Sequence, residues 1–206
     1  MSTRKSAQDR KQEILDTTLD LAFDVGPDHV TTGMIAARLG LTQPAIYKHF
    51  PKKEDVWRAV TETLCARIKE NIRHGEVEGQ PALTNIRHLI LGHLRLVRQC
   101  PALPEIMVTR DPSGNLTETR RRIQEAMGAF RRTLERCLKS AQAQGHLRKE
   151  MQVEDGATLL VGIIQSLVLR LIVTRNPTPL VTDGERLLDM QLALFMYEGL
   201  TKRTPA

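Results

Sequence analysis

The sequence has few aromatic residues and few cysteines, and each shortage excludes a class of protein. Aromatics make up 3% of the 206 residues, so a stacking cage for flat cations is not expected. The three cysteines, Cys65, Cys100 and Cys137, are far apart and odd in number, and no CxxC pair occurs. This spacing predicts reduced thiols in a cytoplasmic protein and argues against a disulfide framework.

The motifs of the common enzyme classes are missing as well. The sequence contains no P-loop, no GxGxxG, no HExxH and no nucleophile elbow. His88 and His93 are five residues apart, so they do not share a helical face, and no Cys/His cluster indicates a metal site. We therefore expect no enzyme, no cofactor and no metal.

A comfortable membrane span is also lacking. The most apolar stretch, residues 159–173, is short and is interrupted by Gln165, Ser166 and Arg170, so it predicts a buried helix. The first 13 residues have no apolar core, and we expect no signal peptide there. These features predict a cytoplasmic protein without a membrane partner.

What the sequence does contain is helical periodicity along nearly its whole length. Asn115–Glu118 resembles a capping box, and Thr182–Glu185 is expected to cap the final helix. No segment alternates convincingly as a strand, so the fold class is all-α with about nine helices. We expect these helices over residues 8–25, 32–39, 43–49, 52–73 and 82–99, a short one reaching about Arg110, and then 116–143, 153–174 and a last one reaching about Leu200.

Two short helices joined by a tight link stand out near the N-terminus. Gly40 suits a left-handed turn, and Thr42 can cap the second helix. Pro44 is tolerated in its first turn, where the backbone N–H has no intrahelical partner. With Ile46 turned to the core, the outward face carries Gln43, Pro44, Tyr47 and Lys48. Such a mixed face is typical of a recognition helix, and a packed helical hairpin is the alternative.

The stretch "TTGMIAARLGLTQPAIYKHFPKKEDV" strongly resembles the DNA-binding motif of the TetR family of bacterial transcriptional regulators. The resemblance covers about residues 8–68, with the motif at about 31–50. It implies a three-helix DNA-binding domain, followed over 69–206 by a C-terminal effector-binding and dimerisation domain. Two departures are Gly33, early in the second helix, and Pro44-Ala45, where glycine is frequent in the family.

The resemblance also implies residue roles in binding an inverted-repeat operator of double-stranded DNA. Thr32, Tyr47 and Lys53 would contact phosphates, and His49 would contact a phosphate or pack at the helix end. The base edges would be faced by Gln43, Pro44, Ala45 and Lys48, and Gln can read adenine bidentately. Together with Thr42, these are the residues we expect at the DNA.

Net charge alone does not locate this surface, although the chain carries +6 with a pI of about 9.5. Residues 1–60 are almost neutral, so binding must depend on where the charges are placed. We expect the tail residues Arg4, Lys5, Arg10 and Lys11, and the cluster Lys48, Lys52 and Lys53, to face DNA, with the stripe Asp16, Asp20 and Asp24 turned away. The alternative is that this tail is simply disordered.

Residues 110–150 hold ten basic against five acidic residues. A solvated helix face is the ordinary explanation of this excess, and an anionic effector is the alternative.

The helix over 153–174 is apolar on most sides, which predicts burial on more than one side. Packing against the last helix and a second subunit would form a homodimer, as the family resemblance implies; a central core helix in a monomer is the alternative. The expected interface residues are Leu160, Ile163, Leu167, Arg170, Leu187, Gln191, Leu194 and Phe195.

Polar residues on apolar faces suggest an unknown small-molecule effector. We expect its pocket between helices 82–99, 116–143 and 153–174, with the helix near Met107 as a lid. The candidate contacts are His93, Met107, Met127, Phe130, Arg131 and Gln165, although each fits a core or boundary position as well. Aliphatic walls would suit a mostly apolar compound with one acidic or hydroxyl end.

These features predict a dimeric one-component transcriptional repressor that an effector releases from DNA. Two alternatives remain open. One is a nucleoid-structural or cell-division DNA-binding protein of the same fold without an effector. The other is a helical interaction module that has lost DNA binding.

Overall fold

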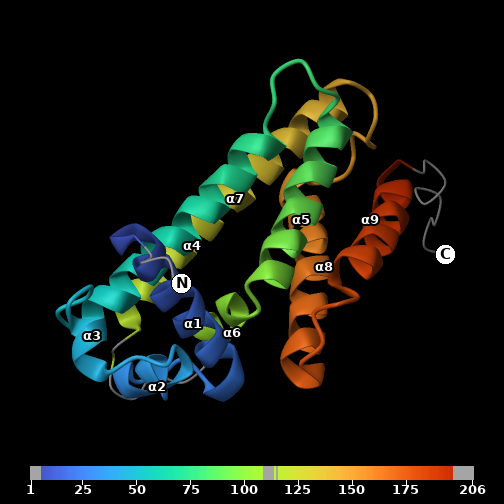
Figure 1. Cartoon of the computed structure of the whole chain (residues 1–206). Helices are drawn as coiled ribbons and strands as arrows, with labels where there is room; N and C mark the ends of the chain where they lie inside the picture. Colours follow the sequence, from blue (N-terminus) through green and yellow to red (C-terminus); the bar gives the residue numbers. More distant parts are fainter. Residues whose placement is uncertain (1–5, 109–113, 115, 197–206) are drawn as a thin grey trace. The chain divides into compact units, whose positions relative to one another are not determined.

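The computed structural model describes residues 6–108, 114 and 116–196 (Figure 1). Every regular element in these residues is a helix, which confirms the all-α prediction. The helices are α1 (Ala7–Val25), α2 (Thr32–Arg38), α3 (Gln43–Tyr47), α4 (Lys53–Gly75), α5 (Ala82–Gln99), α6 (Ala102–Val108), α7 (Thr117–Ala143), α8 (Val153–Thr174) and α9 (Leu180–Met196).

The predicted helix boundaries agree closely, with one correction. Helix α9 begins at Leu180, so Thr182 lies inside the first turn and does not cap the helix. The turn before it is closed by the Asn176 side chain, whose Oδ1 accepts the Thr178 N–H at 3.0 Å. The predicted cap at Asn115 and the predicted helix ends near Arg110 and Leu200 lie outside the described residues.

The chain forms two compact units that are not contiguous in sequence. Unit 1 consists of residues 1–67 and 99–125, and unit 2 of residues 68–98 and 126–206. Helices α4 and α7 contribute residues to both units. The functional division predicted near residue 68 is a different partition and stays a prediction.

The core of unit 1 contains side chains from α1, α2, α3, α6 and the first half of α4. Each of these helices buries its aliphatic residues on one face. A buried hydrogen bond of 2.9 Å between Thr61 and Thr119 also ties α4 to the start of α7. The core residues with no more than 2% exposure include Ile14, Ile35, Ile46, Val60, Leu64, Ile106 and Ile123.

Unit 2 packs long amphipathic helices against one another. Its core is mostly aliphatic and includes Phe130 and Phe195, and α9 approaches α5 closely at Gly184. A Cβ atom at Gly184 would lie 2.1 Å from the Leu94 side chain, so a larger residue would force these helices apart. The fully buried side chains of unit 2 include Ile86, Leu89, Ile90, Leu94, Phe130, Leu134, Leu138, Leu160 and Leu188.

Helix α8 is the one described helix that is long and apolar enough, by length and composition alone, to cross a membrane. In the structure one of its faces is buried in unit 2 through Leu160, Leu167 and Leu171. Its other face is exposed at Leu169 and Val173. The prediction of burial on more than one side is therefore met on one side only within a single chain.

Candidate functional site

Local sequence explains the geometry of the α2–turn–α3 element. Thr31 caps α2, because its hydroxyl accepts the Met34 N–H at 3.2 Å. Gly40 then takes a left-handed conformation, with φ of 65°, as its place in the turn predicts. Thr42 occupies the N-cap position of α3, but its side chain makes no capping hydrogen bond, which corrects the predicted role.

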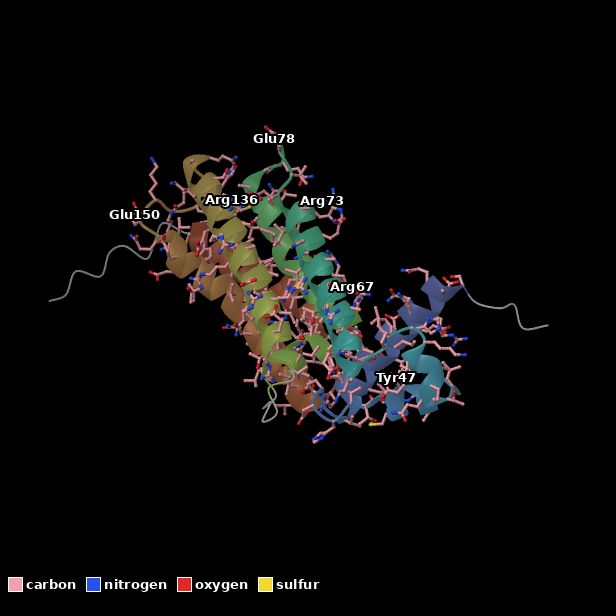
Figure 2. All side chains as sticks on the ribbon, turned by 90° about the vertical axis from the view of Figure 1, so that its left-hand side faces the viewer. Tyr47, Arg67, Arg73, Glu78, Arg136 and Glu150 are labelled. Atoms are coloured by element: carbon pink, nitrogen blue, oxygen red, sulfur yellow. The ribbon has the colours of Figure 1, made fainter. Side chains whose placement is uncertain are left out.

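Helix α3 separates its core and outward faces as expected. Ile46 is fully buried, while Gln43, Tyr47 and Lys48 are exposed. Figure 2 shows Tyr47 on this element. The structure also leaves Thr42 and Pro44 exposed, and Ala45 and His49 half-buried.

Thr32 has a different environment from the other predicted DNA contacts. It is the first residue of α2 and is only 5% exposed. Its Oγ1 accepts a hydrogen bond from Gln43 Nε2 at 2.7 Å and lies 3.2 Å from the Tyr47 hydroxyl. The structure thus joins one predicted base contact and two predicted phosphate contacts in a single hydrogen-bonded group.

Basic side chains border this element on two sides. Lys53 starts α4 and is half-buried, and the Lys52 N–H donates to Asp55 Oδ2 at 3.0 Å, which fixes the beginning of that helix. The ammonium of Lys11, on α1, lies 5.8 Å from the centre of the Phe50 ring, just after α3. Arg10 instead pairs with Glu13 at 2.8 Å. Arg4 and Lys5 lie outside the described residues.

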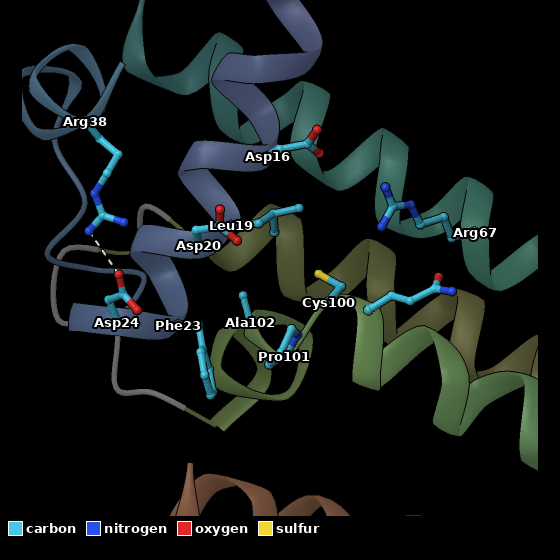
Figure 3. Close-up of a pocket in the computed structure, with 11 residues that line it drawn as sticks. Asp16, Leu19, Asp20, Phe23, Asp24, Arg38, Arg67, Cys100, Pro101 and Ala102 are labelled. Atoms are coloured by element: carbon cyan, nitrogen blue, oxygen red, sulfur yellow. Dashed lines mark hydrogen bonds and ion pairs between the residues drawn. The ribbon is translucent and has the colours of Figure 1, made fainter. Parts of the chain in front are cut away.

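The aspartates of α1 line a hollow of about 420 Å³ in unit 1 (Figure 3). Asp24 pairs with Arg38 at 3.0 Å there, and Asp16 accepts a hydrogen bond from Gln12. Burial, and then the neighbouring Asp16 and Asp24, raise the pKa of Asp20. Arg67 and the segment from Gln99 to Ala102 complete the lining.

His93 is a polar side chain of unit 2 that is buried with one ring nitrogen lacking a hydrogen-bond partner. It is 4% exposed, its ring centre lies 5.2 Å from that of Phe130, and its Nδ1 has no hydrogen-bond partner. Burial lowers its pKa to about 4, so the imidazole is neutral at pH 7. A buried nitrogen without a partner costs free energy, and a bound group could supply that partner.

The structure places the other predicted polar handles elsewhere. Arg131 is nearly half exposed; it pairs within α7 with Glu135 at 2.9 Å and bridges to α8 by donating to Thr158 at 3.0 Å. Gln165 lies on the exposed side of α8. Met127 is half-buried on α7, and Met107 is half-buried on α6, in unit 1. Of the three predicted handles, His93 is the buried one.

Among the residues that the structure describes, α8 and α9 carry most of the exposed large apolar side chains. Val173 is 75% exposed and Leu169 is 64% exposed. We call this set the α8/α9 face: Leu159, Leu169, Val173, Met190, Leu194 and Met196.

Of the predicted dimer residues, Leu194 belongs to this face, and the others range from exposed to fully buried. Leu160, Leu167 and Phe195 are at most 3% exposed within one chain, so they are core residues and the prediction is not supported for them. Ile163 is 9% exposed. Leu194 and Arg170 are exposed, and Leu187 and Gln191 are intermediate. Arg170 is ion-paired with Asp183 of α9.

Two family models match the chain, and together they span more than half of it. One, bacterial regulatory proteins of the tetR family, matches residues 14–60, which contain α2 and α3. The other, the tetracyclin repressor-like C-terminal domain, matches residues 111–182. The chain belongs to the TetR family. As a TetR-family member it is a DNA-binding transcriptional regulator.

Individual relatives agree with this assignment. The transcriptional regulator TtgR of Pseudomonas putida is 23% identical over 92% of this chain and 93% of its own. The nucleoid occlusion factor SlmA of Marinomonas sp. is 23% identical over 80% of this chain and 83% of its own. Among solved structures, a SmeT–triclosan complex has 25% identity and a TM-score of 0.69, covering 97% of this TetR-family chain and 99% of SmeT.

Two features of the site were not found from sequence. The hydrogen-bonded group of Thr32, Gln43 and Tyr47 joins residues 11 and 15 positions apart, and no local pattern reports such a contact. The approach of Lys11 to Phe50 spans a still longer separation. The available signals are that Thr32, Gln43, Tyr47 and Phe50 lie in the motif and that Lys11 belongs to the basic tail expected to face DNA.

Proposed function

We propose that this TetR-family regulator is a homodimeric cytoplasmic repressor that binds an inverted-repeat operator and is released by a small apolar effector. The observation that carries the DNA part is the outward face of α3. Gln43, Tyr47 and Lys48 are exposed around a fully buried Ile46, so the element is anchored by one side and free to contact a partner by the other. This is the arrangement a recognition helix needs in the major groove.

In this proposal Gln43, Pro44, Ala45 and Lys48 face the base edges. Thr42, Tyr47 and Lys53 contact phosphates, and His49 either joins them or packs at the helix end. Lys11 is a further phosphate contact, because its position beside Phe50 keeps a cation next to the element. Phosphate contacts fix the register on the duplex, and base contacts carry the sequence preference.

The exposed α8/α9 face supports the homodimer. Several large apolar side chains exposed on two packed helices are a feature of interaction sites in soluble proteins. A two-fold axis would place the face against its own copy, with Leu169, Val173 and Leu194 at the contact. Two recognition helices related by the same axis would read two half-sites in opposite directions, which is why the operator should be an inverted repeat.

An effector would use the interior of unit 2. His93 offers a neutral hydrogen-bonding nitrogen among aliphatic side chains and Phe130, which suits a mostly apolar compound with one polar end. The SmeT structure, a relative with 25% identity, is a complex with triclosan, an apolar ligand of this general kind. Met127 and Phe130 are the other proposed contacts in unit 2.

The effector-free alternative is favoured by one observation, the similarity to SlmA, a nucleoid occlusion factor. A protein of that kind would bind DNA through the same α3 face without ligand release. The two functions differ in whether ligand and DNA affinities are coupled.

Selection from random duplexes tests the DNA-binding part. We expect an inverted repeat to be recovered, and enrichment of a single unrepeated motif would contradict the dimeric arrangement.

Calorimetric titration of triclosan, used as an apolar phenolic probe, with and without the selected operator tests the coupling. Linkage requires operator to lower probe affinity by the same factor as probe lowers operator affinity. Measurable binding with equal affinities in the two titrations would favour the effector-free function.

A further inference from the structure

Three polar side chains meet where the first turn of α2 approaches α3. The Gln43 amide donates from Nε2 to Thr32 Oγ1 at 2.7 Å. The Tyr47 hydroxyl lies 3.2 Å from Thr32 Oγ1 and 3.4 Å from Gln43 Nε2. Thr32 is almost fully buried, whereas Gln43 is exposed and Tyr47 is 41% exposed. The group therefore has one buried member, Thr32, and two members at the surface.

The Thr32 hydroxyl is not needed for the structure of α2 itself. The cap of that helix is the neighbouring Thr31, which accepts the Met34 N–H. The hydroxyl of Thr32 is instead directed to the two side chains of α3. Its burial also leaves it less available to a phosphate than the Tyr47 hydroxyl beside it.

Bonding to Thr32 leaves a defined part of the Gln43 amide for another partner. Gln43 Nε2 donates to Thr32 Oγ1 and, at the longer distance of 3.4 Å, to the Tyr47 oxygen, and these two acceptors lie only 3.2 Å apart. One amide hydrogen directed between them leaves the other hydrogen and Oε1 available together. Bidentate reading of adenine uses that pair, with N6–H donating to Oε1 and the amide N–H donating to N7. A glutamine already held in one orientation loses less side-chain entropy when it binds.

We propose that Thr32 is the positioning residue that orients the Gln43 amide to read adenine, and that it links this base contact to the Tyr47 phosphate contact. The inference rests on the proposed operator binding. Because Thr32 accepts from Gln43, its own hydrogen can be donated to the Tyr47 oxygen. The Tyr47 hydrogen is then free for a phosphate oxygen, and a chain of such bonds is mutually strengthening.

The test is binding to the selected operator and to versions in which the base pair facing Gln43 is changed. For the wild type we expect about a tenfold preference for adenine, the size of one bidentate contact. Thr32→Val removes the hydroxyl at nearly constant shape, and it should reduce this preference to less than about threefold. Thr32→Ser keeps the hydroxyl and should retain the preference. Gln43→Ala should lose it, and the double variant should lose no more than Gln43→Ala alone.

Tyr47→Phe is the matched comparison, because it removes a hydroxyl of the same group without touching the bond between Thr32 and Gln43. It should weaken all duplexes alike and leave the preference within about twofold of the wild type. If Thr32→Val behaves in this way too, Thr32 is a plain phosphate contact and the inference is wrong, while the proposed operator binding stands. If the wild type binds no duplex preferentially, the proposed function itself fails.

A second measurement does not depend on the stability of the Thr32→Val variant. The side-chain NH₂ resonances of Gln43 in the wild-type protein should report a restrained, hydrogen-bonded amide without DNA. Averaged resonances typical of a freely rotating side chain would overturn the inference even if every Thr32 variant were unfolded.

Discussion

The two compact units distribute polar and apolar groups in opposite ways. In unit 1 the groups offered to a partner are polar and lie on the surface, and the exposed members Gln43 and Tyr47 are held by the buried Thr32. In unit 2 the surface offered to a partner is apolar, with Leu169 and Val173 mostly exposed. A polar atom without a hydrogen-bond partner, His93 Nδ1, lies inside this unit.

This inversion indicates what each unit recognises. A large apolar face marks a surface that a partner covers. In a two-fold dimer that partner is the same face of a second copy. A polar face remains hydrated until a polyanion replaces the water, and its side-chain geometry then determines the sequence it reads. An interior nitrogen can be satisfied only by something small enough to enter.

The largest expected effect comes from placing a charge on the apolar face of unit 2. Leu169→Arg would introduce a desolvated charge twice into a symmetric interface, and we expect dimer affinity to fall roughly a thousandfold, about 4 kcal/mol. Sedimentation across the micromolar range measures the change. Operator affinity should fall with it, because two linked half-sites bind more tightly than one.

Two further substitutions sharpen this prediction. Val77→Arg adds the same charge at a 39%-exposed apolar residue outside the α8/α9 face, and the dimer should be unaffected. Leu167→Arg, only two residues from Leu169, should destabilise the folded protein by roughly 3–5 kcal/mol, because Leu167 is in the core. A wild type that sediments as a monomer would contradict the proposal that the α8/α9 face is covered by a second copy.

The interior nitrogen of unit 2 predicts a pH-dependent stability. The folded-state pKa of His93 is about 4, below the ordinary value of 6.5. Between these values the unfolded chain binds the additional proton, so stability falls as pH falls from 6.5 and levels off below about 4. The full change is about 3 kcal/mol.

Urea unfolding at pH 7.5 and pH 4.5, compared with His93→Leu, isolates this contribution. The variant should lose the part of the pH dependence that His93 supplies. Equal pH dependence in the two proteins would mean that His93 is hydrated or paired. The contrast between an unpartnered nitrogen inside unit 2 and hydrated polar groups on unit 1 would then be lost.

How far the sequence predicts the molecule depends on whether the relevant signal is local. The pattern of α3, with Ile46 inward and Gln43 and Tyr47 outward, follows from helical spacing, and Gly40 follows from turn chemistry. Helix α8 is apolar on most sides, so spacing alone does not decide which of its stripes faces its own core. Leu160 and Leu167 are predicted at the interface for that reason, and the structure places them in the core. Arg131 and Gln165 show the same limit, because a boundary residue and an interior residue have the same spacing.

The polar surface of unit 1 predicts a smaller effect. Lys53→Ala should weaken binding to every duplex by about five- to tenfold and reduce the slope of log affinity against log salt by about one, since one counterion fewer is released. Fluorescence anisotropy at several salt concentrations measures both quantities. Lys69→Ala, at an exposed position further along α4, is the matched control and should change neither. A change in base preference for Lys53→Ala would contradict the division between phosphate and base contacts.

The smallest effect concerns charged pairs on the surface of unit 2, which matter little if its apolar face is the partner surface. Arg136 donates to both carboxylate oxygens of Glu76, at 2.7 and 2.8 Å. These hydrogen bonds lower the pKa of Glu76, so the stabilisation is present above the ordinary carboxyl pKa and is lost as pH falls through the lowered value. Both side chains are about half exposed, so solvent screening should limit the loss of unfolding free energy in Glu76→Gln to about 0.5 kcal/mol.

Urea unfolding at low and high salt tests this prediction, with Glu78→Gln on the same loop as the control. We expect the difference in unfolding free energy between Glu76→Gln and the wild type to shrink as salt is added. A larger loss of unfolding free energy that salt does not reduce would mean that charged pairs on the surface of unit 2 contribute more than this comparison of the two units allows.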